Sequence, residues 1–221
     1  MSFCCLFLFC CVCLWQPTGS QVLRTVILVN VETQLGDHVF LRGGFHHEDL
    51  LGCTREVYSS ACAIPILNTI LQRGDIRYKE WVIGDDYMDW YGPEPFQGKS
   101  MGQPALGTPM TLLNGSWWIA EFEMLCTSAK YNSKDDLWGF DLSILILKPN
   151  GSIVEEAPFN QRGCIYRPLS RLLQSEVMTG WAWGPNHYAL CGHVTQLYWG
   201  GQGKCSYDSV RTFPVQDYIF V

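Results

Sequence analysis

The hydrophobic pattern of the chain predicts strands, and its clearest stretch runs from Arg24 to Gly44. Residues 25–32 are rich in Val, Ile and Thr, which suit a pleated, half-buried surface. Residues 33–37 carry turn chemistry, with Gly36 free to take a positive φ. Residues 39–42 form a second short strand, so the pattern predicts a β-hairpin. Because an apolar hairpin is marginal by itself in water, it must pack on further strands.

Later stretches supply those strands. In residues 116–125 the side chains alternate: one set is predicted to face the core (Trp118, Ala120, Phe122, Met124), and the other to line a half-wet face (Trp117, Ile119, Glu121, Glu123). Residues 138–147 are apolar on both faces towards their end, which is typical of a buried central strand. Shorter strands are predicted at 78–83, 188–190 and 193–198. Residues 92–109, rich in Gly and Pro, are predicted to form a long loop.

Two segments need a separate interpretation. Gly43 and Gly44 allow the backbone to turn or to approach a neighbour closely. Between Cys164 and Val177 the apolar residues recur at helical spacing, and Pro168 suits a first turn, so this segment is predicted to hold one short helix. The expected fold is therefore an all-β, antiparallel, jelly-roll-like sandwich with one short helix.

Composition adds a compartment and a domain count. Residues 1–20 hold five cysteines and no charge, and the apolar run 3–15 has the length of a signal peptide. Thr18 and Ser20 are small residues suited to a cleavage site; an uncleaved N-terminal anchor is the alternative. Residues 21–221 then form a single domain, predicted to be secreted. The net charge of −6 and the absence of a Lys/Arg cluster argue against nucleic acid and membrane surfaces as partners.

Six of the eleven cysteines follow residue 20. An even number in a secreted chain indicates disulfides, although six cysteines allow fifteen pairings. Cys53 and Cys62 are close in sequence, and pairing them would stabilise the fold by about 2–3 kcal/mol on the chain-entropy model. No C-x-x-C spacing occurs among the six, which argues against a zinc site of the usual form. Asn114 and Asn150 begin N-x-S triplets and are predicted to carry N-linked glycans.

A family resemblance rests on several motifs spread over the chain after residue 23. They are T-V-I-L-V at 25–29, T-Q-L-G-D at 33–37, V-F-L-R-G-G at 39–44, S-A-C-A-I-P-I at 60–66, W-V-I-G-D at 81–85, D-W-Y-G at 89–92, G-T-P at 107–109 and N-H-Y-A-L-C-G at 186–192. Together these resemble the extra C-terminal domain behind the catalytic part of some invertebrate α-amylases, which also occurs alone in secreted proteins. The opening motif is more distantly similar to starch-binding β-sandwich modules.

The resemblance implies a secreted, non-catalytic domain that binds carbohydrate, with a polysaccharide or glycan as partner and no cofactor. It also implies the disulfide Cys126–Cys191, because both cysteines lie at matched strand positions. Cys164–Cys205 then follows by elimination once Cys53–Cys62 is assigned. Neither likeness brings a catalytic residue.

The aromatic residues are the main functional signal: the chain holds nine Trp and ten Tyr. Aromatic faces stack on the C–H faces of sugars, while neighbouring carboxylates accept hydrogen bonds from hydroxyls. The predicted carbohydrate-binding residues are Trp81, Asp85, Asp89, Trp90 and Tyr91, with Trp117 as a competing site. Trp181, Trp183, Asn186 and His187 form a third group. The alternative is that most of these rings are core.

Other chemistries fit less well. His46–Asp49 could bind a metal only from an irregular loop, and residues 85–89 lack EF-hand spacing for calcium. Glu121 and Glu123 share one strand face, so they would lie side by side rather than across a glycosidic bond. No G-x-S-x-G or H-E-x-x-H motif is present. A secreted protein-binding or structural domain remains the alternative function, with a small glycoside hydrolase less favoured; oligomeric state is not predicted.

Overall fold

The structure is a computed structural model, and it describes residues 22–45, 63–68, 87–90, 102–107, 116–126, 130–132, 137–159, 164–167, 175–177, 186–201 and 205–210. Within these residues the regular elements are strands and one 3₁₀ turn, η4 (Trp199–Gly201). No helix in this part of the chain has the length and apolar character needed to cross a membrane. The all-β expectation is therefore confirmed.

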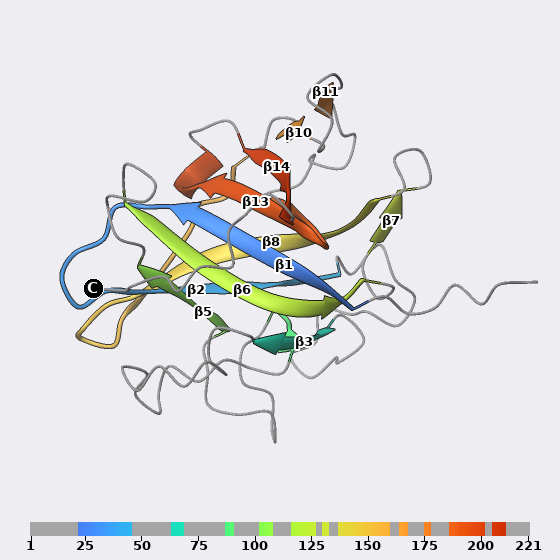
Figure 1. The fold of residues 1–221 in the computed structure, drawn as a ribbon. Coiled ribbons are helices and arrows are strands. Elements are labelled where there is room, and N and C mark those ends of the chain that lie inside the picture. The colour runs from blue at the N-terminus through green and yellow to red at the C-terminus, as the bar shows by residue number, and fades with distance from the viewer. Residues whose placement is uncertain are drawn as a thin grey trace, which may run out of the picture.

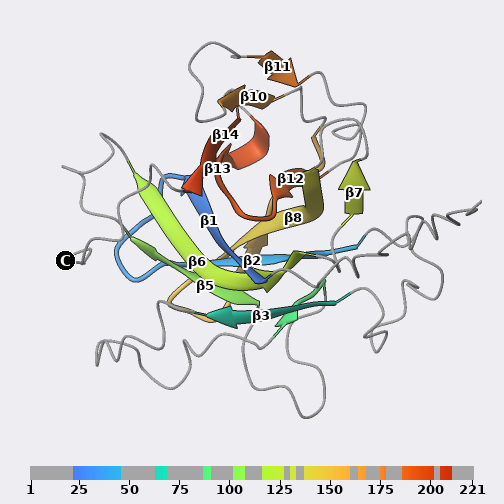
Figure 2. The same ribbon diagram turned by 45° about the vertical axis from the view of Figure 1, so that its right-hand side comes forward.

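The strands form two sheets, which Figure 1 and Figure 2 show from two directions. The first runs in the order β11 (Ser175–Val177), β10 (Cys164–Arg167), β14 (Ser206–Ser209), β13 (His193–Tyr198), β1 (Val22–Asn30), β6 (Trp117–Leu125). Beyond β6 lies β3 (Ile64–Asn68), which also pairs with β4 (Tyr87–Met88). In Figure 1 the strands β1, β6 and β13 pass in front of β2 and β8.

The second sheet is organised on its longest strand, β8 (Leu137–Leu147). Its order is β5 (Gln103–Gly107), β2 (His38–Gly44), β8, β12 (His187–Leu190), and β7 (Lys130–Asn132) and β9 (Ile153–Glu155) also pair with β8. Strand β5 pairs with both β2 and β6, so it links the two sheets.

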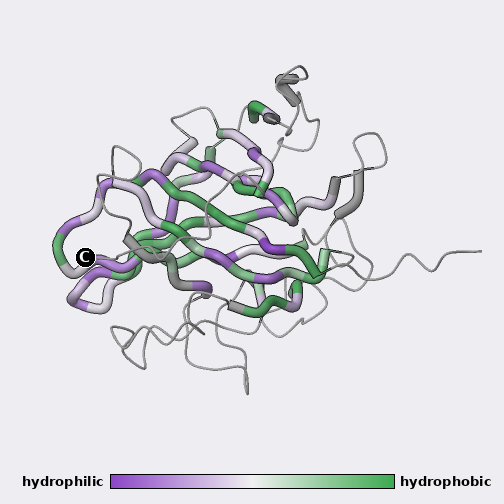
Figure 3. The backbone as a smooth tube through the Cα atoms, viewed as in Figure 1, coloured by the Kyte–Doolittle hydropathy of each residue, from purple (hydrophilic) through white to green (hydrophobic). Residues whose placement is uncertain are grey.

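The main core lies between the sheets, and both contribute to it. Ile27, Val29 and Phe122 come from the first sheet, and Leu41 and Ile144 from the second, all of them fully buried. Figure 3 shows the hydrophobic residues concentrated along the strands. Two layers packed on one apolar core make a β-sandwich, as the alternation along the strands predicted.

The predicted hairpin between β1 and β2 is wrong, although both strands exist. β1 pairs with β6 and β13, whereas β2 pairs with β5 and β8 in the other sheet. Since both edges of each strand are already occupied, residues 31–37 form a connection that crosses between the layers. Gly36 does take a positive φ of 90° there, as predicted.

Two further expectations need correction. The predicted helix between Cys164 and Val177 is wrong at both ends, where β10 and β11 lie paired as strands; residues 168–174 fall outside the described residues. The sandwich is also not wholly antiparallel, because β1–β13 and β10–β14 are parallel pairs. In both cases long-range pairing decides the structure, because a parallel neighbour must come from a distant part of the chain.

Two disulfides join the layers and their edges. Cys126–Cys191 links the end of β6 to the turn after β12, with Cα atoms 5.7 Å apart, and so connects the two sheets. Cys164–Cys205 links β10 to the start of β14, with Cα atoms 4.7 Å apart. Both pairings agree with the sequence expectation. Each closes a long loop, which contributes about 4 kcal/mol on the chain-entropy model. Cys53 and Cys62 lie outside the described residues, so that pairing stays a prediction.

The crossing between β1 and β2 is anchored by a buried carboxylate. Oδ2 of Asp37 accepts hydrogen bonds from Nζ of Lys148 at 2.7 Å and from the N–H of Gln34 at 2.8 Å. These two hydrogen bonds, the Lys148 one first, lower the pKa of Asp37 against the opposing effect of burial. The crossing loop is thereby tied to the end of β8.

We expect Asp37→Asn to flatten the acid dependence of stability. The lowered folded-state pKa means that Asp37 stabilises the fold fully above its unfolded pKa of about 3.9, and that this contribution disappears as the pH falls through the folded value. Urea unfolding between neutral pH and pH ~3 measures this. Glu123→Gln, which changes an exposed carboxylate on β6, is the control. Equal acid sensitivity in Asp37→Asn and the native protein would contradict the assignment.

A second prediction concerns Gly43. A Cβ at this position would collide with the backbone oxygen of Asp141 and press on Leu142 of β8, so the strands approach too closely for any side chain. Gly44, beside it, takes a φ of 147°. We expect Gly43→Ala to lower the free energy of unfolding by about 1–3 kcal/mol, the usual cost of overpacking. Chemical denaturation measures this, and an unchanged free energy of unfolding would contradict the close approach of β2 and β8 at this residue.

Candidate functional site

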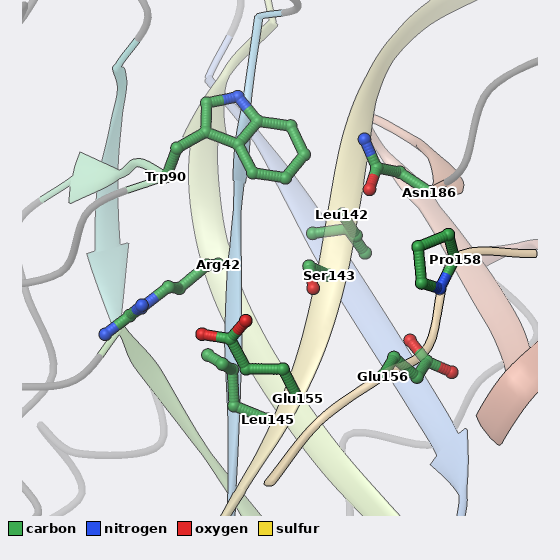
Figure 4. Close-up of a pocket in the computed structure, with 9 residues that line it drawn as sticks. All are labelled: Arg42, Trp90, Leu142, Ser143, Leu145, Glu155, Glu156, Pro158 and Asn186. Atoms are coloured by element: carbon green, nitrogen blue, oxygen red, sulfur yellow. The ribbon is translucent and has the colours of Figure 1, made fainter. Parts of the chain in front are cut away.

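A pocket opens where one edge of β8 loses its strand partner. On this edge β9 pairs with residues 145–147 and β12 with residues 139–142. On this edge, in the described part of the chain, no strand pairs with Ser143 and Ile144 between β9 and β12, whereas β2 pairs with both residues on the opposite edge. The gap leaves a pocket of about 300 Å³, drawn in Figure 4. Its lining residues are Arg42, Trp90, Leu142, Ser143, Leu145, Glu155, Glu156, Pro158 and Asn186.

The strand registers place four of these residues on one sheet face. Arg42 of β2 lies opposite Ser143, and Glu155 of β9 lies opposite Leu145. Residues two apart on β8 share a face, so Ser143 and Leu145 both point away from the main core. Arg42 and Glu155 therefore lie on either side of β8, on the outer face of the second sheet. Figure 4 shows both side chains at the pocket.

Trp90 is held over this face by backbone contacts. The carbonyl of Asp89 accepts a hydrogen bond from the N–H of Gly43 at 2.8 Å, which ties residues 87–90 to the end of β2. The indole Nε1 of Trp90 donates to the carbonyl of Phe45 at 2.8 Å. In Figure 4 the indole nitrogen points away from Glu155, while the six-membered ring extends towards Asn186. The polar edge is thus engaged, and apolar ring surface lines the pocket.

The opposite wall is fixed by a buried polar contact. Nε2 of His187 lies 2.9 Å from Oε1 of Glu156, and both side chains are almost fully buried. The N–H of Gly200 donates to the same oxygen. The ring of Phe159 packs on His187, with centroids 4.5 Å apart. This contact joins residues 156–159 to the start of β12, where Asn186 lies.

One basic side chain, Arg42, and two acidic side chains, Glu155 and Glu156, line the pocket. Burial lowers the pKa of Arg42, while the charges of Glu155 and Asp89 act in the opposite direction and favour the guanidinium. Arg42 is the single basic side chain among the described lining residues, and the charges of two acids, Glu155 and Asp89, act on it. Apolar ring, guanidinium, carboxylate, hydroxyl and amide thus meet in one small pocket, an arrangement typical of a site for a small polar ligand.

The consecutive carboxyls do not form a hydrolytic pair. Successive side chains in extended backbone point to opposite sides, and Figure 4 shows the carboxylates of Glu155 and Glu156 directed differently. Glu156 is engaged with His187 and Gly200. The other pair considered from the sequence lies on the first sheet: Glu121 is buried and bridged by Arg24 at 3.0 and 3.1 Å, and Glu123 is exposed.

Of the predicted sugar-binding residues, Trp90 lines the pocket. Asp89 lies beside it, 5 % exposed, with its charge acting on Arg42. Trp81, Asp85 and Tyr91 fall outside the described residues. The pocket also brings in Asn186 of the third aromatic group, next to His187.

Trp117 does not belong to this site, and the half-wet face predicted for it is wrong. It is 8 % exposed and packs against Tyr198 with ring centroids 5.4 Å apart. A second apolar cluster, Val26, Leu28, Trp117, Ile119 and Val194, covers this outer face of the first sheet. The alternation within β6 was predicted correctly, but its outer face is buried at Trp117, Ile119 and Glu121 and exposed at Glu123.

Four polar pocket residues were not predicted: Arg42, Ser143, Glu155 and Glu156. A signal for Arg42 exists in the sequence, because it occupies an outward position of an otherwise apolar strand. Glu155 and Glu156 follow the exposed Ile153 and Val154, and nothing local separates them from a solvated acidic turn. Their role depends on β8, which brings β9 beside β2.

Among the described residues no three His, Cys, Asp or Glu side chains are grouped to hold a metal ion. The His46–Asp49 stretch lies outside these residues, as do the remaining acids of the considered calcium site, Asp85 and Asp86.

Comparison with known proteins adds little. No protein-family model and no curated protein matches the chain. Among solved structures, a glycoside hydrolase family 15 glucoamylase from Hypocrea jecorina aligns with 85% of this chain at 12% identity and a TM-score of 0.32, over 17% of the glucoamylase. A structural likeness at that level carries no argument about fold or function.

We predict that His187→Leu destabilises the protein through Glu156. Losing the imidazole leaves a buried carboxylate oxygen with one partner fewer, which costs about 1–3 kcal/mol or more if the group is charged. Urea denaturation measures the change. The same substitution in a Glu156→Gln background should cost less, because a neutral amide is cheaper to bury. Strictly additive effects in this double-mutant cycle would contradict the coupling.

Proposed function

We propose that the protein is a secreted, non-catalytic carbohydrate-binding protein and that the pocket between β2, β8 and β9 takes the sugar. The observation that carries the proposal is the pairing of the Trp90 ring with hydrogen-bonding groups on three elements. Sugars present apolar C–H faces and a rim of hydroxyls, so an aromatic surface beside polar groups complements both. Arg42 and Asn186 can donate, Glu155 can accept, and Ser143 can do both.

The site is preorganised for this role. Trp90 is fixed by its hydrogen bond to Phe45, and the opposite wall by the contact between Glu156 and His187. A ring that is already oriented loses little conformational freedom when a ligand stacks on it. These restraints support binding by a rigid pocket rather than by a loop that folds over its ligand.

Secretion is supported by the cysteines and by a candidate glycan site. Disulfides persist mainly in oxidising compartments, and two are present here. Asn150 is exposed in the β8–β9 turn, where its Oδ1 accepts hydrogen bonds from the N–H of Ser152 at 2.9 Å and from its hydroxyl at 2.7 Å. The acceptor triplet is therefore accessible. Asn114 and residues 1–20 lie outside the described residues, so their glycan and signal-peptide assignments remain predictions.

The resemblance to the amylase-associated domain agrees with this proposal and remains a prediction. A secreted protein-binding domain is the second candidate, supported by two exposed apolar residues, Ile153 and Val154, on β9. Such an edge can pair with an added strand. Hydrolysis of a chromogenic glycoside would instead indicate an enzyme.

Trp90→Ala tests the proposal directly. Screening on a glycan array followed by titration calorimetry should show binding by the native protein and a loss of about tenfold or more, equal to ~1.4 kcal/mol, in the variant. Trp90→Phe keeps an aromatic face but loses the hydrogen bond to Phe45, so an intermediate affinity is expected.

The matched control is Trp117→Phe, which changes a buried ring on the other sheet and should leave sugar affinity unchanged. Melting temperatures separate loss of the site from loss of the fold. No glycan retained by the native protein, or full affinity in a folded Trp90→Ala protein, would contradict the proposal.

A further inference from the structure

The size of the pocket limits what can enter it. Its volume of about 300 Å³ corresponds to roughly ten water molecules at ~30 Å³ each. That space holds one sugar ring with its hydroxyls. A longer glycan would therefore place a single ring in the pocket and extend outwards.

The charges limit the kind of ring. Arg42 and Glu155 lie on the same face of the second sheet and both line the pocket, and the charges of Glu155 and of Asp89, the residue before Trp90, act on the Arg42 guanidinium. One positive charge is thus already matched by two acids. A ligand carboxylate or sulfate would add a third negative charge beside them. Like charges placed side by side in a binding site weaken binding.

The neighbouring residue, Glu156, sets the direction in which the side chain of Glu155 leaves the backbone. Glu156 is anchored on His187 and Gly200, and the alternation of extended backbone then directs Glu155 to the opposite side. Glu155 also pairs across from Leu145 in the register of β9 and β8. This backbone placement brings the exposed side chain of Glu155 to the pocket.

We propose that the pocket selects a single non-acidic sugar ring, neutral or amino-substituted, and that Glu155 sets this preference by placing a negative charge at the pocket that opposes a ligand carboxylate. This inference rests on the proposed carbohydrate binding and deepens it. In the pocket Glu155 accepts hydrogen bonds from ring hydroxyls and excludes uronic, sialic and sulfated sugars by repulsion, which is specificity by an unfavourable element.

The test compares pairs of closely similar sugars that differ in charge. The pairs are glucose and glucuronic acid, galactose and galacturonic acid, and glucose and glucosamine. Titration calorimetry with the full mature protein measures each affinity at low and high salt. We expect each acid to bind at least about tenfold more weakly than its neutral partner, with a smaller difference at high salt because the repulsion is screened.

Glu155→Gln is the decisive variant. Removing the negative charge removes the repulsion of a ligand carboxylate, so the neutral-to-acid affinity ratio should fall about tenfold. Glu123→Gln makes the same change of net charge at an exposed position of the first sheet and should leave the ratio unchanged. Melting temperatures of both variants check that the fold is kept.

The outcomes separate the two proposals. If no sugar of the panel binds the native protein, carbohydrate binding fails and this inference fails with it. If neutral sugars bind but the acids bind equally well or better, the proposed function stands and the charge selection is overturned. An unchanged ratio in a folded Glu155→Gln protein likewise overturns the role given to Glu155.

Discussion

The pairing of β8 with its neighbours is the constraint on which the rest of the structure depends. One strand of Leu137–Leu147 hydrogen-bonds to β2, β7, β9 and β12. Its core-facing residues fill the space between the sheets, while its outer face carries Ser143 and Leu145. Because β9 and β12 divide one edge between them and leave a gap, the same pairing that builds the sheet also creates the pocket.

The surrounding elements keep that gap from closing or filling. The turn of β8 into β9 is tied to the β1–β2 crossing by Asp37 and Lys148. The turn after β12 is tied to β6 by the Cys126–Cys191 disulfide. Glu156 and His187 then join the segments that leave β9 and enter β12. Close-packed protein interiors transmit strain, so the pocket walls are coupled to the rest of the sandwich.

Hydrogen bonds hold several side chains of the pocket in place, and one basic and two acidic side chains line it. Trp90, Glu156 and His187 are held by hydrogen bonds that face away from the ligand space or are buried, which leaves ring surface and the Arg42–Glu155 side chains for recognition. A half-buried guanidinium acted on by the charges of two acids favours ligands that exchange hydrogen bonds without bringing a negative charge of their own. Proposed function and proposed specificity therefore come from the same few residues.

The sequence by itself predicted several strands, because alternation and β-branching act within a few residues: the strands predicted at 116–125, 138–147, 188–190 and 193–198 are β6, β8, β12 and β13, and Gly36 takes its positive φ. The predicted loop at 92–109 instead contains β5. Cys126–Cys191, implied by the family resemblance, and Cys164–Cys205, which followed by elimination, are paired. Trp90 was predicted as a sugar-binding residue, because aromatic and acidic residues crowd around it in the chain, and it lines the pocket. Only the tertiary structure decided that β1 and β2 lie in different sheets, that residues at 164–167 and 175–177 pair as strands, and that the Trp117 face is covered. Arg42 and Glu155 come to the same pocket only through the register of β2, β8 and β9. The local sequence pattern determines which residues form strands. Which strands pair depends on the burial of apolar surface over the whole chain. A site made of residues from several paired strands can therefore be predicted only once the pairing is known.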